Sequence, residues 1–88
     1  MAQSPAHILL VEDSNALARV YEEFLAVEGH TVTRVASAAA AMRALADSAP
    51  DIMVLDLQLP DGDGLGFLST LRGRALRTPI IILTARDK

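Results

Sequence analysis

Three short runs, apolar almost throughout, divide this chain into similar units. They are HILLVE at residues 7–12, DIMVLD at residues 51–56 and IIIL at residues 80–83. Runs of this length without alternating polar positions are typical of parallel strands buried on both faces of a sheet. Segments with helical spacing lie between them. The sequence therefore predicts an α/β fold, with right-handed crossovers and helices on both faces of a parallel sheet.

The segment between the first two runs predicts two helices and a weaker strand. From Ser14 onward apolar side chains recur at helical spacing, and Gly29 stands where a left-handed residue would end the helix. Residues 30–36 (HTVTRVA) are rich in β-branched side chains but alternate imperfectly, which predicts a strand at the edge of the sheet. Ser37 is a candidate N-cap for an alanine-rich helix that extends through Leu45.

The run of turn-forming residues LQLPDGDG at 57–64 predicts a loop before a third helix. Thr78 and Pro79 would end this helix just before the last strand. No linker or low-complexity segment separates the units. We therefore expect a single domain over residues 1–88, with residues 1–6 as a flexible N-terminus.

Composition excludes several classes of protein. With 51% hydrophobic and 22% charged residues, the chain is too apolar to remain disordered. A net charge of −3 disfavours direct binding of nucleic acid, and the absence of cysteine excludes disulfides and cysteine-ligated zinc. No apolar stretch approaches the roughly 18 residues of a membrane span, and no basic leader precedes the first apolar run. We expect a cytoplasmic protein that does not bind membranes.

Acids or a hydroxyl follow three of the four predicted strands. Glu12 and Asp13 end the first strand, Asp56 ends the third and Thr84 follows the fourth. Ligands of open parallel sheets bind beyond the carboxyl ends of the strands. If the first and third strands are neighbours, three carboxylates meet there, and their repulsion raises at least one pKa unless a cation neutralises them. Ligands that are all oxygen indicate Mg²⁺, and phosphoryl chemistry with it.

Each of these residues also has a simpler interpretation. Asp13 alone is a plausible helix N-cap, Asp56 alone could face solvent, and Thr84 alone could be an ordinary β-branched strand residue. Their occurrence together, at the ends of several strands, favours a shared site.

These residues resemble a known family. Glu12-Asp13 after one apolar strand, Asp56 after another, Leu59-Pro60 followed by Gly64, and Thr84-Ala85 are similar to the motifs of the receiver domain of two-component response regulators. The run LDLQLPDGDGL is most similar to receivers that head transcriptional regulators. The resemblance implies a flavodoxin-like, doubly wound parallel sheet with strand order 2-1-3-4.

The resemblance also implies a role for each residue. Asp56 would be the phosphoacceptor, taking a phosphoryl group from a histidine of a partner kinase or phosphotransfer protein. Asp13, Asp56 and the backbone carbonyl of Gln58 would bind Mg²⁺, with Glu12 acting directly or through water. Such a module is a signalling phosphoacceptor, not an enzyme.

Three further positions follow from the same resemblance. Thr84 would donate its hydroxyl to a phosphoryl oxygen and draw its loop inward as the switch. Pro60 and Gly64 would shape the loop after Asp56.

The sequence also departs from the family. Receivers have a lysine at the end of a fifth strand, a switch aromatic on that strand and a final helix–strand–helix, which this sequence does not contain. Lys88 does not match the lysine. We therefore expect weaker phosphoryl acceptance. We also expect Ile80 to Leu83 to form an exposed apolar edge that promotes self-association.

Two other functions are compatible with parts of this pattern. A receiver-like scaffold could serve only for interaction or oligomerisation, without chemistry. A haloacid-dehalogenase-type phosphatase also uses a strand-end aspartate with Mg²⁺, but its general acid two positions later is replaced here by Gln58. The output domain and the cognate kinase are not identified by these residues.

Overall fold

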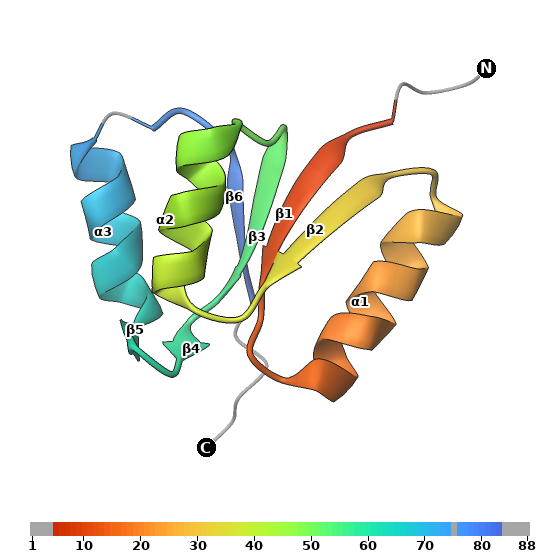
Figure 1. Cartoon of the computed structure of the whole chain (residues 1–88), viewed down its shortest axis with the longest axis horizontal. Coiled ribbons are helices and arrows are strands. Elements are labelled where there is room, and N and C mark those ends of the chain that lie inside the picture. The colour runs from red at the N-terminus through yellow and green to blue at the C-terminus, as the bar shows by residue number, and fades with distance from the viewer. Residues whose placement is uncertain (1–4, 75, 84–88) are drawn as a thin grey trace.

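A four-stranded parallel sheet forms the centre of the computed structural model, which describes residues 5–74 and 76–83 (Figure 1). The strand order is β2-β1-β3-β6, which confirms the predicted order 2-1-3-4. The four strands, in chain order, are β1 (His7–Val11), β2 (Thr31–Val35), β3 (Ile52–Asp56) and β6 (Ile80–Leu83). The expected edge position of the second strand is also confirmed.

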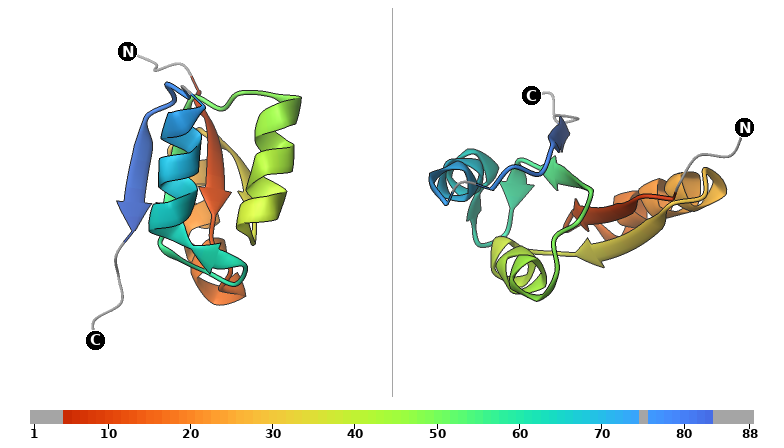
Figure 2. Two further views of the ribbon diagram at one scale, coloured as in Figure 1. Left: turned by 90° about the vertical axis from the view of Figure 1, so that its left-hand side faces the viewer. Right: turned by 90° about the horizontal axis from the view of Figure 1, so that it is seen from above.

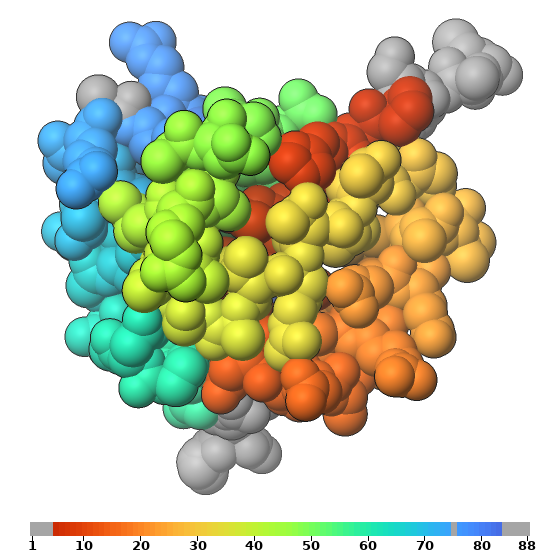
Figure 3. Space-filling model, viewed as in Figure 1, coloured from red at the N-terminus to blue at the C-terminus, as the bar shows by residue number. Residues whose placement is uncertain are grey.

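Helices cover both faces of this sheet, as predicted. Figure 2 shows α2 (Ala38–Asp47) and α3 (Gly64–Gly73) on one face and α1 (Asn15–Val27) on the other. Figure 3 shows the first of these faces, where α2 lies between β2 and α3. The part of the chain that the structure describes contains no fifth strand of the main sheet and no fourth helix.

The main hydrophobic core lies between the sheet and the helices α2 and α3, on the side that is called the α2–α3 face below. Side chains that point to this face are buried, and they come from the two central strands and from both helices: Leu9, Val11, Ala41, Met53, Leu55, Phe67 and Leu71. Ile8 and Leu10 of β1 are buried on the opposite face. Burial of β1 on both faces explains why its sequence has no polar alternation.

Serine side chains begin the first two helices. Ser14 Oγ accepts a hydrogen bond from the Leu17 amide at 3.2 Å, so the interpretation of Asp13 as an N-cap is wrong. The predicted N-cap at Ser37 is confirmed, because its Oγ accepts from the Ala40 amide at 3.1 Å. Gly29, with a φ of +94°, adopts the positive-φ conformation predicted just after α1.

The segment predicted as a loop contains a small antiparallel hairpin. Its strands are β4 (Gln58–Leu59) and β5 (Gly62–Asp63), and β5 begins directly after the turn with Gly62 at a φ of +146°. Strands of two residues are too short to show an alternating pattern, so the sequence predicted only the turn.

The second face of the sheet is less covered. Ala18 is the buried residue of α1, whereas Val20, Phe24 and Val27 of the same helix are exposed. On β6, Ile81 is 53% exposed, as the predicted apolar edge requires. None of the helices in residues 5–74 and 76–83 is long and apolar enough to cross a membrane.

Candidate metal centre

The pairing of β1 with β3 brings three acids together. These neighbouring strands run parallel with Val11 opposite Leu55, so the residues that follow them emerge at the same edge of the sheet. Glu12, Asp13 and Asp56 each place one carboxylate oxygen there, and these three oxygens all lie within 4.8 Å of one another. The convergence predicted from the strand ends is therefore present.

The three carboxylates differ in their exposure to solvent. Glu12 is 1% exposed and Asp56 is 6% exposed, whereas Asp13 is exposed. Two buried acids with one at the surface make a site that is closed on the protein side and open to solvent on the other. The simpler interpretation of Asp56 as a solvent-facing acid is wrong.

The charge on Glu12 is disfavoured by its surroundings. Burial raises the pKa of Glu12 above its usual value of 4.5, and the nearby charges of Asp56 and Asp13 raise it further. A hydrogen bond from the Ser14 amide to Oε2, at 3.0 Å, opposes this by lowering the pKa. The hydrogen bond between the Glu12 and Asp56 side chains also raises the pKa of Glu12, so these surroundings favour the protonated form of Glu12.

This donor set fits Mg²⁺. All three side chains offer oxygen, they converge on one point, and their mutual repulsion is the kind that a divalent cation relieves. The exposed side of Asp13 leaves room for the waters that Mg²⁺ retains.

The loop after Asp56 is held close to the cluster. The Gln58 amide donates to Asp56 Oδ1 at 3.2 Å, and the Gly64 amide donates to the Leu57 carbonyl at 2.7 Å. A Cβ added at Gly64 would lie 2.5 Å from Leu57 Cα, so only glycine fits without a shift of the backbone. Pro60 lies in the turn of the hairpin, between Leu59 and Gly62. Thr84 and Lys88 lie outside the described residues.

Sequence reasoning missed two residues that support this region. Arg34 of β2 donates from Nε to the Glu12 carbonyl at 2.9 Å. Asp61 accepts hydrogen bonds from the amides of Ala38 and Ala39. Both contacts join residues more than twenty positions apart, so no local pattern in the sequence could have indicated them.

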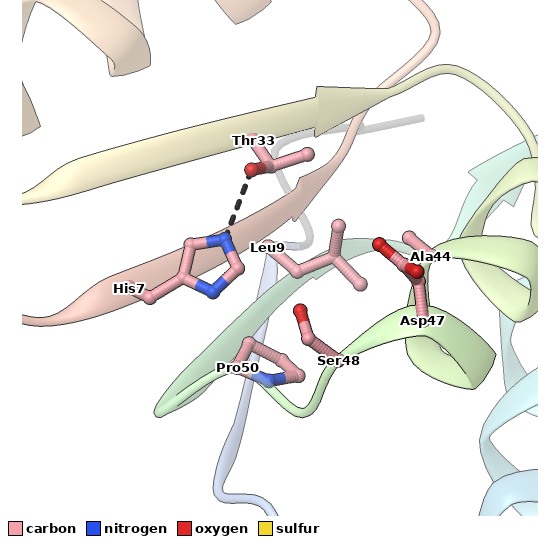
Figure 4. Close-up of a pocket in the computed structure, with 7 residues that line it drawn as sticks. All are labelled: His7, Leu9, Thr33, Ala44, Asp47, Ser48 and Pro50. Carbon is pink, nitrogen blue, oxygen red and sulfur yellow. Dashed lines mark hydrogen bonds between the residues drawn. The ribbon is translucent and has the colours of Figure 1, made fainter.

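A hollow of about 100 Å³ lies at the other end of the strands (Figure 4). A hydrogen bond of 2.9 Å joins His7 Nε2, at the start of β1, and Thr33 Oγ1, and both residues line this hollow. Ligand sites of parallel sheets form at the carboxyl ends, and this hollow is at the amino end. The acidic cluster is therefore the better candidate site.

Comparison with known proteins decides the family. The family model of the response regulator receiver domain matches residues 8–88. The chain belongs to this family. The receiver fold and the acidic cluster at the expected place thus agree with the resemblance seen in the motifs, and two-component signalling is the family's context.

Curated receiver-containing relatives are much longer than this chain. The chain is 44% identical over 81 residues to the response regulator protein PmrA of Pseudomonas aeruginosa, covering 92% of this chain and 37% of PmrA. It is 39% identical over 79 residues to the transcriptional regulatory protein KdpE of Mycobacterium tuberculosis, covering 90% of this chain and 34% of KdpE. The chain therefore spans little more than a third of either relative.

Solved receivers have the same fold. The MaeR response regulator bound to beryllium trifluoride superposes with a TM-score of 0.86 at 30% identity, covering 93% of this chain and 69% of that one. The receiver domain of the Francisella response regulator 1452 gives a TM-score of 0.87 at 26% identity, covering 94% and 69%.

Proposed function

We propose that this receiver accepts a phosphoryl group on Asp56 from a phosphohistidine of a sensor histidine kinase or phosphotransfer protein, with Mg²⁺ bound. The observation that carries the proposal is the convergence of Glu12, Asp13 and Asp56 at the carboxyl edge of the sheet. Membership of the receiver family supports the same chemistry and a histidine kinase as the class of partner.

In this reaction a carboxylate oxygen of Asp56 attacks phosphorus. A P–O bond forms as the P–N bond to the kinase histidine breaks, and the imidazole leaves with the electron pair of that bond. The hydrogen bond from the Gln58 amide to Oδ1 orients the carboxylate before the attack. Burial of Asp56 limits its hydration and favours reaction with phosphorus at the open side of the site.

Glu12, Asp13, Asp56 and the backbone carbonyl of Gln58 are the groups that we propose to hold Mg²⁺. Bound Mg²⁺ would neutralise these acids and the charge on the incoming phosphoryl oxygens. A protonated Glu12 must lose its proton on binding, because metal ligands bind in the deprotonated form. Metal affinity is therefore expected to fall at acidic pH.

Three other positions keep the roles proposed from the sequence. We propose that Thr84 donates its hydroxyl to a phosphoryl oxygen and acts as the switch. Pro60 and Gly64 are proposed to shape the loop after Asp56, and the tight fit of Gly64 against Leu57 supports this role. Because the curated relative KdpE is named as a transcriptional regulatory protein, we propose a role in the control of transcription.

The test is the intact mass of the chain after incubation with Mg²⁺ and a small phosphodonor. We expect a gain of one phosphoryl group in the wild type and none in Asp56→Asn. Asp47→Asn is a matched control, because Asp47 is an exposed aspartate at the end of α2, away from the cluster, and this variant should still gain the group. No gain in the wild type, or an equal gain in Asp56→Asn, would contradict the proposal.

A further inference from the structure

Asp61 connects the hairpin that follows Asp56 to the start of α2. Its Oδ1 accepts a hydrogen bond from the Ala38 amide at 2.9 Å, and its Oδ2 accepts one from the Ala39 amide at 3.0 Å. Both oxygens of one carboxylate thus bind two successive amides of a helix that lies more than twenty residues earlier in the chain. Figure 1 shows β4 and β5 beside this end of α2.

These contacts complete the cap of α2. Ser37 Oγ accepts from the Ala40 amide, and the Ser37 carbonyl accepts from the Ala41 amide at 3.0 Å. The amides of Ala38 and Ala39 would otherwise point from the helix end without an acceptor in their own segment. A carboxylate is favoured here by the helix dipole, and the two hydrogen bonds lower the pKa of Asp61. The link is therefore ionised at neutral pH.

The same hairpin carries part of the candidate metal centre. Gln58, whose carbonyl is a proposed ligand, pairs with Asp63 across the hairpin, and its amide donates to Asp56 Oδ1. The Gly64 amide fixes the far end of the loop to the Leu57 carbonyl. Asp61, in the turn of the hairpin, attaches the outer end of this unit to α2. The loop is thus anchored at Asp56, at its closing residue and at α2.

We propose that Asp61 is a positioning residue for the metal centre, because its contacts with α2 hold the hairpin in the arrangement that binds Mg²⁺. This inference rests on the proposed function, since it assumes that the acidic cluster binds Mg²⁺. Coupling between two sites is reciprocal. If the Asp61 contacts strengthen Mg²⁺ binding, Mg²⁺ must strengthen the Asp61 contacts by the same factor.

The experiment titrates Mg²⁺ into the ¹⁵N-labelled chain and follows the amide signals by NMR. We expect Asp61→Ala to lower Mg²⁺ affinity by about 5-fold or more. Asp61→Asn, which keeps one acceptor oxygen without the charge, should fall between this variant and the wild type. Asp63→Asn is the matched control, because Asp63 is in the same hairpin but caps α3 through the Gly66 amide, and asparagine still caps. It should bind Mg²⁺ as the wild type does.

Water exchange of two amides in the wild type gives a second readout that a merely structural role would not change. Saturation with Mg²⁺ should slow exchange at Ala38 and Ala39 by a factor close to the loss of affinity in Asp61→Ala. The Ala40 amide, which binds Ser37, is the internal reference.

The outcomes separate the two proposals. Absence of Mg²⁺ binding by the wild type would overturn the metal centre and this inference with it. If the wild type binds Mg²⁺ and Asp61→Ala binds it with the same affinity, the role of Asp61 is overturned and the metal centre is not. If Asp61→Ala does not fold, the exchange measurement on the wild type decides, and equal exchange at Ala38 and Ala39 with and without Mg²⁺ would overturn the role.

Discussion

The two faces of the sheet are packed to different degrees. On the α2–α3 face, buried side chains of β1 and β3 meet Ala41, Phe67 and Leu71 in one continuous core. On the α1 face, Phe24 is 65% exposed and Ile81 of the edge strand is 53% exposed. The acids of the candidate centre follow β1 and β3, the two central strands. The comparison indicates that the position of the site depends on the α2–α3 core and little on the exposed residues of the other face.

The largest expected effect comes from a cavity in that core. Leu55 is fully buried and directly precedes Asp56, so Leu55→Ala should lower the free energy of unfolding by about 2–5 kcal/mol. Phe24→Ala, on the other face, should change it by no more than about 0.5 kcal/mol, because the side chain is already mostly in solvent. Urea denaturation measures both. Similar losses in the two variants would show that the faces contribute equally.

A smaller effect is expected from the loop that closes behind Asp56. A methyl group at residue 64 would collide with the Leu57 backbone, so Gly64→Ala should destabilise the fold by about 1–3 kcal/mol. Gly73→Ala is the control, because nothing lies within 4 Å of a Cβ at that position. It should shift stability by less than about 1 kcal/mol. Equal unfolding midpoints for the two variants would contradict the close approach of residues 64 and 57.

The acidic centre should give stability a distinct dependence on pH. Because burial raises the pKa of Glu12, the folded chain keeps this proton at a pH where the unfolded chain has lost it. In the absence of Mg²⁺, the contribution of Glu12 is therefore greatest below its usual pKa of 4.5 and is lost as the pH rises through the folded-state value. Glu12→Gln should remove this slope. Thermal unfolding between pH 4 and pH 8 measures it, and a slope that is the same in the variant would assign it to other groups.

The smallest effect is expected at the edge of the sheet. Within the described residues, β6 pairs on one side, with β3, and its Ile81 and Ile82 are exposed. Such an edge can pair with a second copy of the chain. We expect concentration-dependent self-association in sedimentation experiments, reduced in Ile81→Lys. A wild-type chain that stays monomeric at micromolar concentration would contradict this expectation, and with it the alternative function as an assembly module.

The features of the fold that could be predicted are those with a local signal. Apolar runs predicted three strands of the main sheet and β-branched residues predicted β2, while Ser37 and Gly29 predicted the ends of helices. These signals are local because strand burial and capping depend on neighbouring residues. The acids of the centre could be predicted since parallel strands place their carboxyl ends at one edge.

The features that could not be predicted depend on contacts between distant segments. The β4–β5 hairpin has strands too short to show a period. The contacts of Asp61 with α2 and of Arg34 with the Glu12 carbonyl arise only after the segments pack together. The sequence places Asp61 in a turn, and nothing near it indicates that its carboxylate serves a helix elsewhere.

The order of the strands has a consequence for how the acidic centre comes into existence during folding. Asp13 and Asp56 are separated along the chain by α1, β2 and α2, yet they meet because β3 pairs with β1. In the sheet, β2 lies on one side of β1 and β3 lies on the other, so the chain crosses β1 between these two strands. No early, local intermediate contains the complete set of acids, and long-range strand pairing is slow. The appearance of Mg²⁺ affinity in a refolding experiment would therefore mark closure of the β1–β3 pair.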